Sequence, residues 1–226
     1  MSPLRFDQPA KKFVFLARSF GRHALELGNE IPKQPLYFLK APSSVISEGQ
    51  PVILPAECEL VHYEAEVAVV IGKTLSKVSA QEAELAIAAW TILNDVTARS
   101  TQREEGGRFT RAKGYDTFCP IASTWLDQLD WRAARVQGWL NGVCVQNAPL
   151  TDMIFTPGEA IASISSVMTL NAGDIVSLGT PAGVGALSDG DVFEVRLCKD
   201  ETYAQNPDEH TVLLSFSHQV RDGSDE

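Results

Sequence analysis

Short apolar runs bounded by polar turns recur along this chain of 226 residues. Runs of this kind, rich in β-branched and aromatic residues, are typical of strands. They predict strands at residues 13–17, 35–40, 62–72, 90–96, 136–145, 175–178 and 191–197, with the pair Asn141-Gly142 as a hairpin tip. Helical patterns are fewer, and they predict helices at residues 19–28, 82–89 and 156–168. Strands outnumber helices, which favours an α+β, strand-dominated single domain over a doubly wound sheet.

The remaining segments are read as loops and ends. We expect a loose N-terminal arm at 1–12, one domain at 13–220 and a polar tail at 221–226. Residues 100–117 are polar and contain glycine, and loops of this length are more often functional than not. The glycine-rich stretch 179–185 lacks the lysine of a phosphate-binding loop and no helix pattern follows it, which argues against nucleotide binding there.

The most informative stretch is His62-Tyr-Glu-Ala-Glu-Val-Ala-Val-Val-Ile-Gly72, read as one strand. Residues i and i+2 of a strand point to the same face, so Glu64 and Glu66 would project side by side, with Cβ atoms roughly 7 Å apart. A solvent-exposed strand face is the ordinary explanation of such a pair. Here Ala68 and Val70 continue the same face as apolar residues. Two carboxylates beside an apolar face repel each other unless a proton or cation lies between them, and a hard divalent cation suits the pair.

Three further polar residues are candidates for a functional site. Asp95 lies at the polar end of the apolar strand predicted at residues 90–96, which we interpret as the rim of a functional site. His23 and Glu26 are three residues apart on the expected helix 19–28 and so share a face, either as a surface ion pair or as a catalytic pair.

Composition narrows the classes of function. The formal net charge of −10 leaves no basic block for a nucleic acid. No apolar run approaches the ~20 residues of a membrane helix, and the run Phe13–Ala17 is too short for a secretory signal. The widely spaced Cys58, Cys119, Cys144 and Cys198 are read as reduced thiols, with Cys119 a weak candidate nucleophile. We expect a cytoplasmic protein that binds neither membrane nor nucleic acid.

Five motifs, in order, resemble the fumarylacetoacetate hydrolase family, in particular its small single-domain branch acting on acylpyruvates and oxaloacetate. They are HYEAEVAVVIG, NDVTAR, AKGYDTFCP, LNGVCVQNAPLTDMIF and GTPAGVG, and the similarity spans roughly Phe13 to Leu197. The resemblance implies a mixed β-roll of the family's C-terminal-domain type that forms a homodimer. It also implies Mg²⁺ or Mn²⁺ on Glu64, Glu66 and Asp95, catalysis by His23, Glu26 and Lys113, and substrate contacts from Gln102, Thr180 and Arg99.

The implied reaction is hydrolysis of the C–C bond of an acylpyruvate, such as fumarylpyruvate or acetylpyruvate, to pyruvate and a carboxylic acid. His23, oriented by Glu26, would activate the attacking water. Oxaloacetate decarboxylation and isomerisation or hydration of 2-oxo-diene acids in aromatic catabolism remain open, because the same enolate serves all three. A non-catalytic binding protein for a metal or small acid is the alternative of another class. Three positions depart from the family pattern: Phe20 replaces a usual tyrosine, Gly114 a common serine and Ser100 a common acidic residue.

Overall fold

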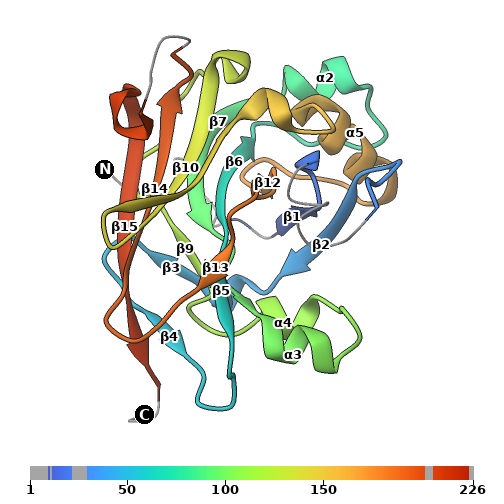
Figure 1. The fold of residues 1–226 in the computed structure, drawn as a ribbon. Coiled ribbons are helices and arrows are strands. Elements are labelled where there is room, and N and C mark those ends of the chain that lie inside the picture. Colours follow the sequence, from blue (N-terminus) through green and yellow to red (C-terminus); the bar gives the residue numbers. More distant parts are fainter. Residues whose placement is uncertain (1–9, 11, 22–29, 202–205, 224–226) are drawn as a thin grey trace.

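The computed structural model describes residues 10, 12–21, 30–201 and 206–223 (Figure 1). Three sheets dominate this part of the chain, and its helices are short and lie outside the sheets. The strand-dominated α+β class is therefore confirmed. No helix in the described ranges is long and apolar enough to cross a membrane.

The largest sheet has seven strands and holds the central stretch of the sequence. In spatial order they are β2 (Leu36–Lys40), β1 (Phe13–Ala17), β12 (Ile175–Ser177), β6 (Ala65–Ile71), β7 (Ile87–Asn94), β9 (Cys119–Ile121) and β3 (Val45–Ser47). The sheet is mixed, since β1 pairs parallel with β12 while β6 pairs antiparallel with β7.

The other two sheets lie beside it. The five-stranded sheet has the order β11 (Val143–Pro149), β10 (Ala134–Leu140), β14 (Val192–Lys199), β15 (Val212–Asp222) and β4 (Val52–Leu54). The three-stranded sheet has the order β13 (Gly185–Ala186), β5 (Val61–Tyr63) and β8 (Thr97–Ala98). The β10–β11 hairpin turns at Asn141 and Gly142, both with positive φ (50° and 81°), as the sequence predicts.

The helices form two groups (Figure 1). α2 (Ala80–Glu84) packs against α5 (Pro157–Val167), and the approach is close enough that a Cβ on Gly158 would lie 2.4 Å from the carbonyl oxygen of Ala80. α3 (Arg99–Glu104) and α4 (Thr110–Lys113) lie together at the other end of the molecule. The described ranges also contain four 3₁₀ turns: η1 (Pro42–Ser44), η2 (Trp131–Ala133), η3 (Leu150–Asp152) and η4 (Pro207–Glu209).

Every residue of β6 is buried, and its two faces belong to different cores. Val67, Val69 and Ile71 lie in the main core, which fills the space between the large and five-stranded sheets. Ala68 and Val70 lie in a smaller cluster on the other face, packed with residues such as Phe15. The Glu64 and Glu66 positions continue this second face, so the expectation of carboxylates next to an apolar face is confirmed.

Several predicted boundaries were wrong. The stretch 62–72 is two strands, β5 and β6, with a break at Glu64. The helix expected at 82–89 ends at Glu84, because the alanine-rich residues that follow pair with β6 instead. This is tertiary pairing overriding helix propensity. β7 accordingly covers 87–94 rather than 90–96, and residues 100–117 contain α3 and α4 rather than only loop.

The ends of the chain also differ from the expectation. β15 was not predicted, and its residues Arg221 and Asp222 pair with β4 although we expected the tail to begin at 221. Most of the helix expected at 19–28 lies outside the described residues. Ser19, the first residue of that predicted helix, donates its hydroxyl hydrogen to the carbonyl oxygen of Leu178 at 2.6 Å.

Candidate functional site

Three buried carboxylates form the centre of the site. Each of Glu64, Glu66 and Asp95 offers an oxygen, and these oxygens all lie within 4.8 Å of one another. The strand register produces this arrangement, because Ala65 on β6 pairs with Asn94 on β7. Glu64 and Glu66 flank Ala65, and Asp95 follows Asn94. The three residues are at most 4% exposed, so this cluster is not a solvated face.

Asn94 holds the strand break in place. Its Oδ1 accepts the backbone N–H of Glu64 at 2.8 Å, which fixes the orientation of the amide. The amide nitrogen then donates to Nε2 of His218 on β15, at 2.9 Å. His218 is buried, and this burial lowers its pKa to about 4, so the ring is a neutral acceptor at neutral pH. The break that presents Glu64 is thus tied to the C-terminal strand.

Three cations surround two of the carboxylates. Lys113 Nζ donates to Oε2 of Glu64 at 2.8 Å and to Oδ2 of Asp95 at 2.5 Å. Lys40 Nζ lies 2.5 Å from the other oxygen of Asp95, and the Arg99 guanidinium pairs with Oε1 of Glu64. Glu66 has no ion pair within the described part of the chain, and its carboxylate accepts the hydroxyl hydrogen of Ser177.

The buried charged groups of the site shift one another's pKa values. Burial raises the pKa of Glu66 well above its ordinary value, and the neighbouring Asp95 and Glu64 raise it further. For Lys113, burial alone would lower the pKa, but Asp95 and Glu64 outweigh it and the pKa is raised. Lys113 is therefore a protonated donor at neutral pH. The oxygen-only donor set, with Glu66 lacking a cationic partner, fits a hard divalent cation such as Mg²⁺ or Mn²⁺.

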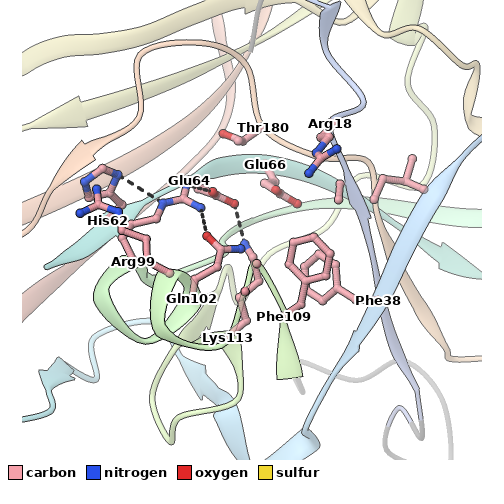
Figure 2. Close-up of a pocket in the computed structure, with 15 residues that line it drawn as sticks. Arg18, Phe38, His62, Glu64, Glu66, Arg99, Gln102, Phe109, Lys113 and Thr180 are labelled. Carbon is pink, nitrogen blue, oxygen red and sulfur yellow. Dashed lines mark hydrogen bonds and ion pairs between the residues drawn. The ribbon is translucent and has the colours of Figure 1, made fainter. Parts of the chain in front are cut away.

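A cavity of about 480 Å³ opens over the carboxylates (Figure 2). Its wall has polar side chains from β5, α3 and α4 on one side and apolar ones from β1, β2 and the α3–α4 connection on the other. It is lined by Leu16, Ala17, Arg18, Phe38, His62, Glu64, Glu66, Arg99, Gln102, Arg103, Gly106, Gly107, Phe109, Lys113 and Thr180. Such a mixed lining, with convergent polar groups at one end, is typical of a small-molecule site.

Most of the candidates from the sequence meet at this cavity. Lys113, Arg99, Gln102 and Thr180 line it together with Glu64 and Glu66, while Asp95 lies behind Lys113. Oε1 of Gln102 accepts from Arg99 at 2.9 Å. His23 and Glu26 lie outside the described residues, so their catalytic roles stay predictions, as do the substrate-binding and metal-binding roles of the others.

The hydroxyl of Thr180 is already used within the fold. It donates to the carbonyl oxygen of Ala65 at 2.9 Å and accepts from Nε2 of Gln146 at 2.8 Å. Gln146 also accepts the N–H of Ala65 through its other amide atom, at 2.9 Å. Both residues therefore fix the backbone between Glu64 and Glu66.

Sequence reasoning missed several parts of the site. Lys40 ends the run Pro35–Lys40, and a lysine closing an apolar strand was the available signal. Ser177 sits in the predicted strand 175–178, directly across from Ala68 in the register, but strand pairing cannot be read from one sequence. Arg18 and the stacked pair Phe38–Phe109, whose ring centroids are 4.7 Å apart, carried no pattern that set them apart.

The three departures from the family pattern have distinct environments. Phe20 is buried in the main core and does not line the cavity over the carboxylates. A Cβ on Gly114 would lie 2.5 Å from the carbonyl oxygen of Thr110, which explains glycine next to Lys113. The Ser100 hydroxyl is buried and has no hydrogen-bond partner among the described residues.

The cysteines agree with the expectation of reduced thiols, since all four are free. Cys119 is fully buried, and burial raises the pKa of its thiol to about 12. A thiol with this pKa is a poor nucleophile at neutral pH. This argues against catalysis by Cys119.

A match to a family model shows to which protein family the chain belongs. Residues 12–209 match the model of the fumarylacetoacetate (FAA) hydrolase C-terminal domain. The chain belongs to the fumarylacetoacetate hydrolase family. It is 36% identical to a mitochondrial oxaloacetate decarboxylase of Dictyostelium discoideum over 196 residues, covering 84% of this chain and 90% of that one. It is 37% identical to a mitochondrial oxaloacetate tautomerase of Caenorhabditis elegans over 197 residues, covering 85% and 92%.

Solved structures of the family share the fold. A 5-carboxymethyl-2-hydroxymuconate delta-isomerase of Mycobacterium smegmatis superposes with a TM-score of 0.81 at 33% identity, over 95% of this chain and 80% of that one. A fumarylpyruvate hydrolase of Pseudomonas aeruginosa, in complex with Mn²⁺ and pyruvate, has a TM-score of 0.81 at 24% identity, over 96% and 93%. The expected β-roll of the family is confirmed.

Proposed function

We propose that this family member is a divalent-metal-dependent enzyme that forms the enolate of a short 2-oxo acid, and that it tautomerises oxaloacetate between its enol and keto forms. The carrying observation is the set of three buried carboxylates with oxygens within 4.8 Å, next to a protonated Lys113 on the cavity wall. The similarity to oxaloacetate enzymes supports the choice of substrate.

Glu64, Glu66 and Asp95 would hold Mg²⁺ or Mn²⁺, and the Mn²⁺ in a structure of the same fold supports a divalent ion. The cation would supply a Lewis acid that favours the enolate of a 2-oxo acid. Ser177 keeps the Glu66 carboxylate oriented, and Lys40 does the same for one oxygen of Asp95. One oxygen of each of the three carboxylates lies within 4.8 Å of the other two.

Lys113 and Arg99 would act on the substrate directly. Lys113 would donate the proton that arrives at C3 of the enol and regain one from solvent, while the enol hydroxyl loses its proton to water. Arg99, held by Glu64 and Gln102, would orient the substrate carboxylate. The stacked rings of Phe38 and Phe109 would exclude water from one side of the chain.

Hydrolysis of acylpyruvates is the second candidate. Its specific support is the His23–Glu26 pair in the sequence, a base of the kind that C–C hydrolysis needs for its water. Tautomerisation needs no such water, and neither does decarboxylation. We further propose that the enzyme is a homodimer, as the resemblance to the family implies, and that it is cytoplasmic, in keeping with its free thiols.

The test compares two readouts on the same enzyme under three conditions, which are Mg²⁺, Mn²⁺ and EDTA. Loss of the enol absorbance of oxaloacetate measures tautomerisation, and coupled pyruvate detection measures cleavage of oxaloacetate, acetylpyruvate and fumarylpyruvate. We expect metal-dependent enol decay far faster than pyruvate release from oxaloacetate. Faster pyruvate release from an acylpyruvate would establish the hydrolase instead. Metal-independent rates, or none at all, would overturn the proposed function.

A further inference from the structure

The β10–β11 hairpin carries a sequence motif that has no part in the proposed chemistry. One of its residues, Gln146 on β11, is 1% exposed and belongs to the five-stranded sheet. A buried amide needs partners for its oxygen and for both of its N–H hydrogens. The side-chain partners of Gln146 lie outside its own sheet, in the segments that form the cavity over the carboxylates.

The amide oxygen of Gln146 holds the backbone between the two glutamates. Oε1 accepts the N–H of Ala65 at 2.9 Å, and Ala65 is the first residue of β6. The carbonyl oxygen of Ala65 accepts the hydroxyl hydrogen of Thr180, also at 2.9 Å. Both backbone polar groups of Ala65 therefore bond to side chains from other segments. Their orientation sets the directions in which the side chains of Glu64 and Glu66 leave the chain.

The amide nitrogen of Gln146 holds the opposite partner of this arrangement. Nε2 donates to Oγ1 of Thr180 at 2.8 Å and to the carbonyl oxygen of Pro181 at 2.9 Å, so both amide hydrogens are used. These residues belong to the glycine-rich stretch 179–185. Thr180 lines the cavity, and Figure 2 shows it on the same side as Glu66. One amide thus joins the chain that carries the carboxylates to the Thr180 wall.

Two glycines allow this close approach. Gly138 on β10 lies opposite Gln146 in the register, and a Cβ there would lie 3.0 Å from Oε1 of Gln146 and 3.1 Å from Cβ of Ala65. Gly183 has a φ of 97°, and a Cβ on it would lie 2.2 Å from the carbonyl oxygen of Val145. Glycine in a strand often marks such a close contact. Three separate segments of the sequence are thus adapted to the contact around Gln146.

We propose that Gln146 is a positioning residue, which holds Glu64 and Glu66 in place relative to the Thr180 wall of the cavity. It acts through Ala65 and Thr180 rather than by touching the cation or the substrate. Residues that orient metal ligands from behind typically affect metal affinity 10- to 100-fold. This inference rests on the proposed function, since it takes the carboxylates to be ligands of a divalent cation.

The test compares Gln146→Met with Gln137→Met. Methionine keeps the length of the side chain but makes none of these hydrogen bonds. Gln137 on β10 is 0% exposed, accepts from Nε1 of Trp139 at 3.0 Å and donates to the carbonyl oxygen of Pro207 at 2.7 Å. Neither partner lines the cavity over the carboxylates. Both variants lose buried hydrogen bonds, so denaturant unfolding should show that both are less stable than wild type.

The affinity for Mn²⁺, measured by calorimetry on folded protein, separates positioning from stability. We expect Gln146→Met to weaken Mn²⁺ binding at least tenfold and to lower kcat at saturating Mn²⁺, whereas Gln137→Met should change the Kd less than twofold. An unchanged Kd in Gln146→Met, or equal weakening in both variants, would overturn the positioning role.

Variants of Thr180 test the route of the effect. Thr180→Val removes the hydroxyl and should weaken Mn²⁺ binding more than Thr180→Ser, which keeps it. In Gln146→Met/Thr180→Val the two losses should not add, because both side chains hold Ala65. Additive losses would contradict this route. If Gln146→Met weakens Mn²⁺ binding in an enzyme that converts none of the 2-oxo acids, the proposed function fails and the positioning role stands. A wild type that binds no Mn²⁺ would overturn both.

Discussion

The ammonium group of Lys40 lies 2.5 Å from Oδ1 of Asp95, and the two side chains are 0% and 1% exposed. The carbonyl oxygens of Val96 and Phe118 accept the other hydrogens of the ammonium group, at 3.1 and 2.7 Å. All three donors of Lys40 are therefore used inside the protein. Lys113 holds the second oxygen of Asp95, so two lysines from distant parts of the sequence fix one carboxylate.

Replacing Lys40 by methionine should destabilise the protein strongly. The variant leaves Asp95 and two buried carbonyl groups without their donor, and breaking one side of a buried pair costs about 3–5 kcal/mol. Denaturant unfolding measures this loss. Lys12→Met is the matched control, because Lys12 pairs with Asp174 at 2.6 Å but is partly exposed at 24%. An equal, small change in both variants would contradict the structural role of Lys40.

Glu66→Ala should abolish metal-dependent turnover while the fold survives. Glu66 has no ion pair in the described part of the chain, so its removal leaves no buried cation unpaired, but it removes one of three oxygen ligands. We expect activity to fall at least 100-fold and the affinity for Mn²⁺, measured by calorimetry, to fall in parallel. Glu82→Ala changes a carboxylate in the exposed capping box of α2 and serves as the control. Activity that survives in Glu66→Ala would exclude the carboxylate set as the metal site.

Acid should destabilise the protein through His218. Its folded-state pKa of about 4 lies below the unfolded value of 6.5, so the unfolded chain binds the proton more readily. Stability is fully present above about pH 6.5 and is lost progressively as the pH falls toward 4, by about 3 kcal/mol for this group alone. Protonation would also set two donors, His218 and the Asn94 amide, against each other.

The measurement is the free energy of unfolding from pH 7 to pH 4.5 in wild type and His218→Gln. A glutamine oxygen can accept from Asn94 without titrating, so the variant should show a shallower loss with acid. Parallel curves for the two proteins would assign the acid sensitivity to other groups.

Gly114→Ala should shift the segment that carries Lys113. The added Cβ meets the backbone carbonyl of Thr110 at 2.5 Å, and a backbone atom cannot move aside as a flexible side chain does. We expect about 1–3 kcal/mol of destabilisation, as for overpacking, and a fall in kcat larger than the change in Mn²⁺ affinity. Wild-type kcat in the variant would show that α4 adjusts freely.

The sequence allowed the three clustered carboxylates to be predicted better than their surroundings. Alternation along one strand placed Glu64 beside Glu66, and a polar strand end singled out Asp95. The resemblance to the family then joined the three residues, which lie within 32 positions of the sequence. Ser177 and His218 reach the same place from strands far along the chain. Their contacts depend on strand order, which periodicity does not encode.

The errors in the predicted fold have the same origin. The segment after Glu84 is rich in alanine and reads as helix, yet its pairing with β6 makes it strand. β15 alternates buried and exposed residues along most of its length, but its serines and histidine weakened the apolar signal. Local sequence propensity determined the helix caps and the β10–β11 turn. The strand and helix boundaries that were predicted wrongly depend on residues that are neighbours in space.

The burial of both faces of β6 limits which insertions and deletions the chain can tolerate. Because side chains alternate along a strand, a slip of one residue would exchange the faces and drive Glu64 and Glu66 into the main core, with Val67 toward the cavity. Such a slip would cost the packing of two cores at once. An insertion or deletion within 65–71 is therefore forbidden by hydrophobic packing alone, and the spacing of the acidic residues is protected even where selection on catalysis is absent.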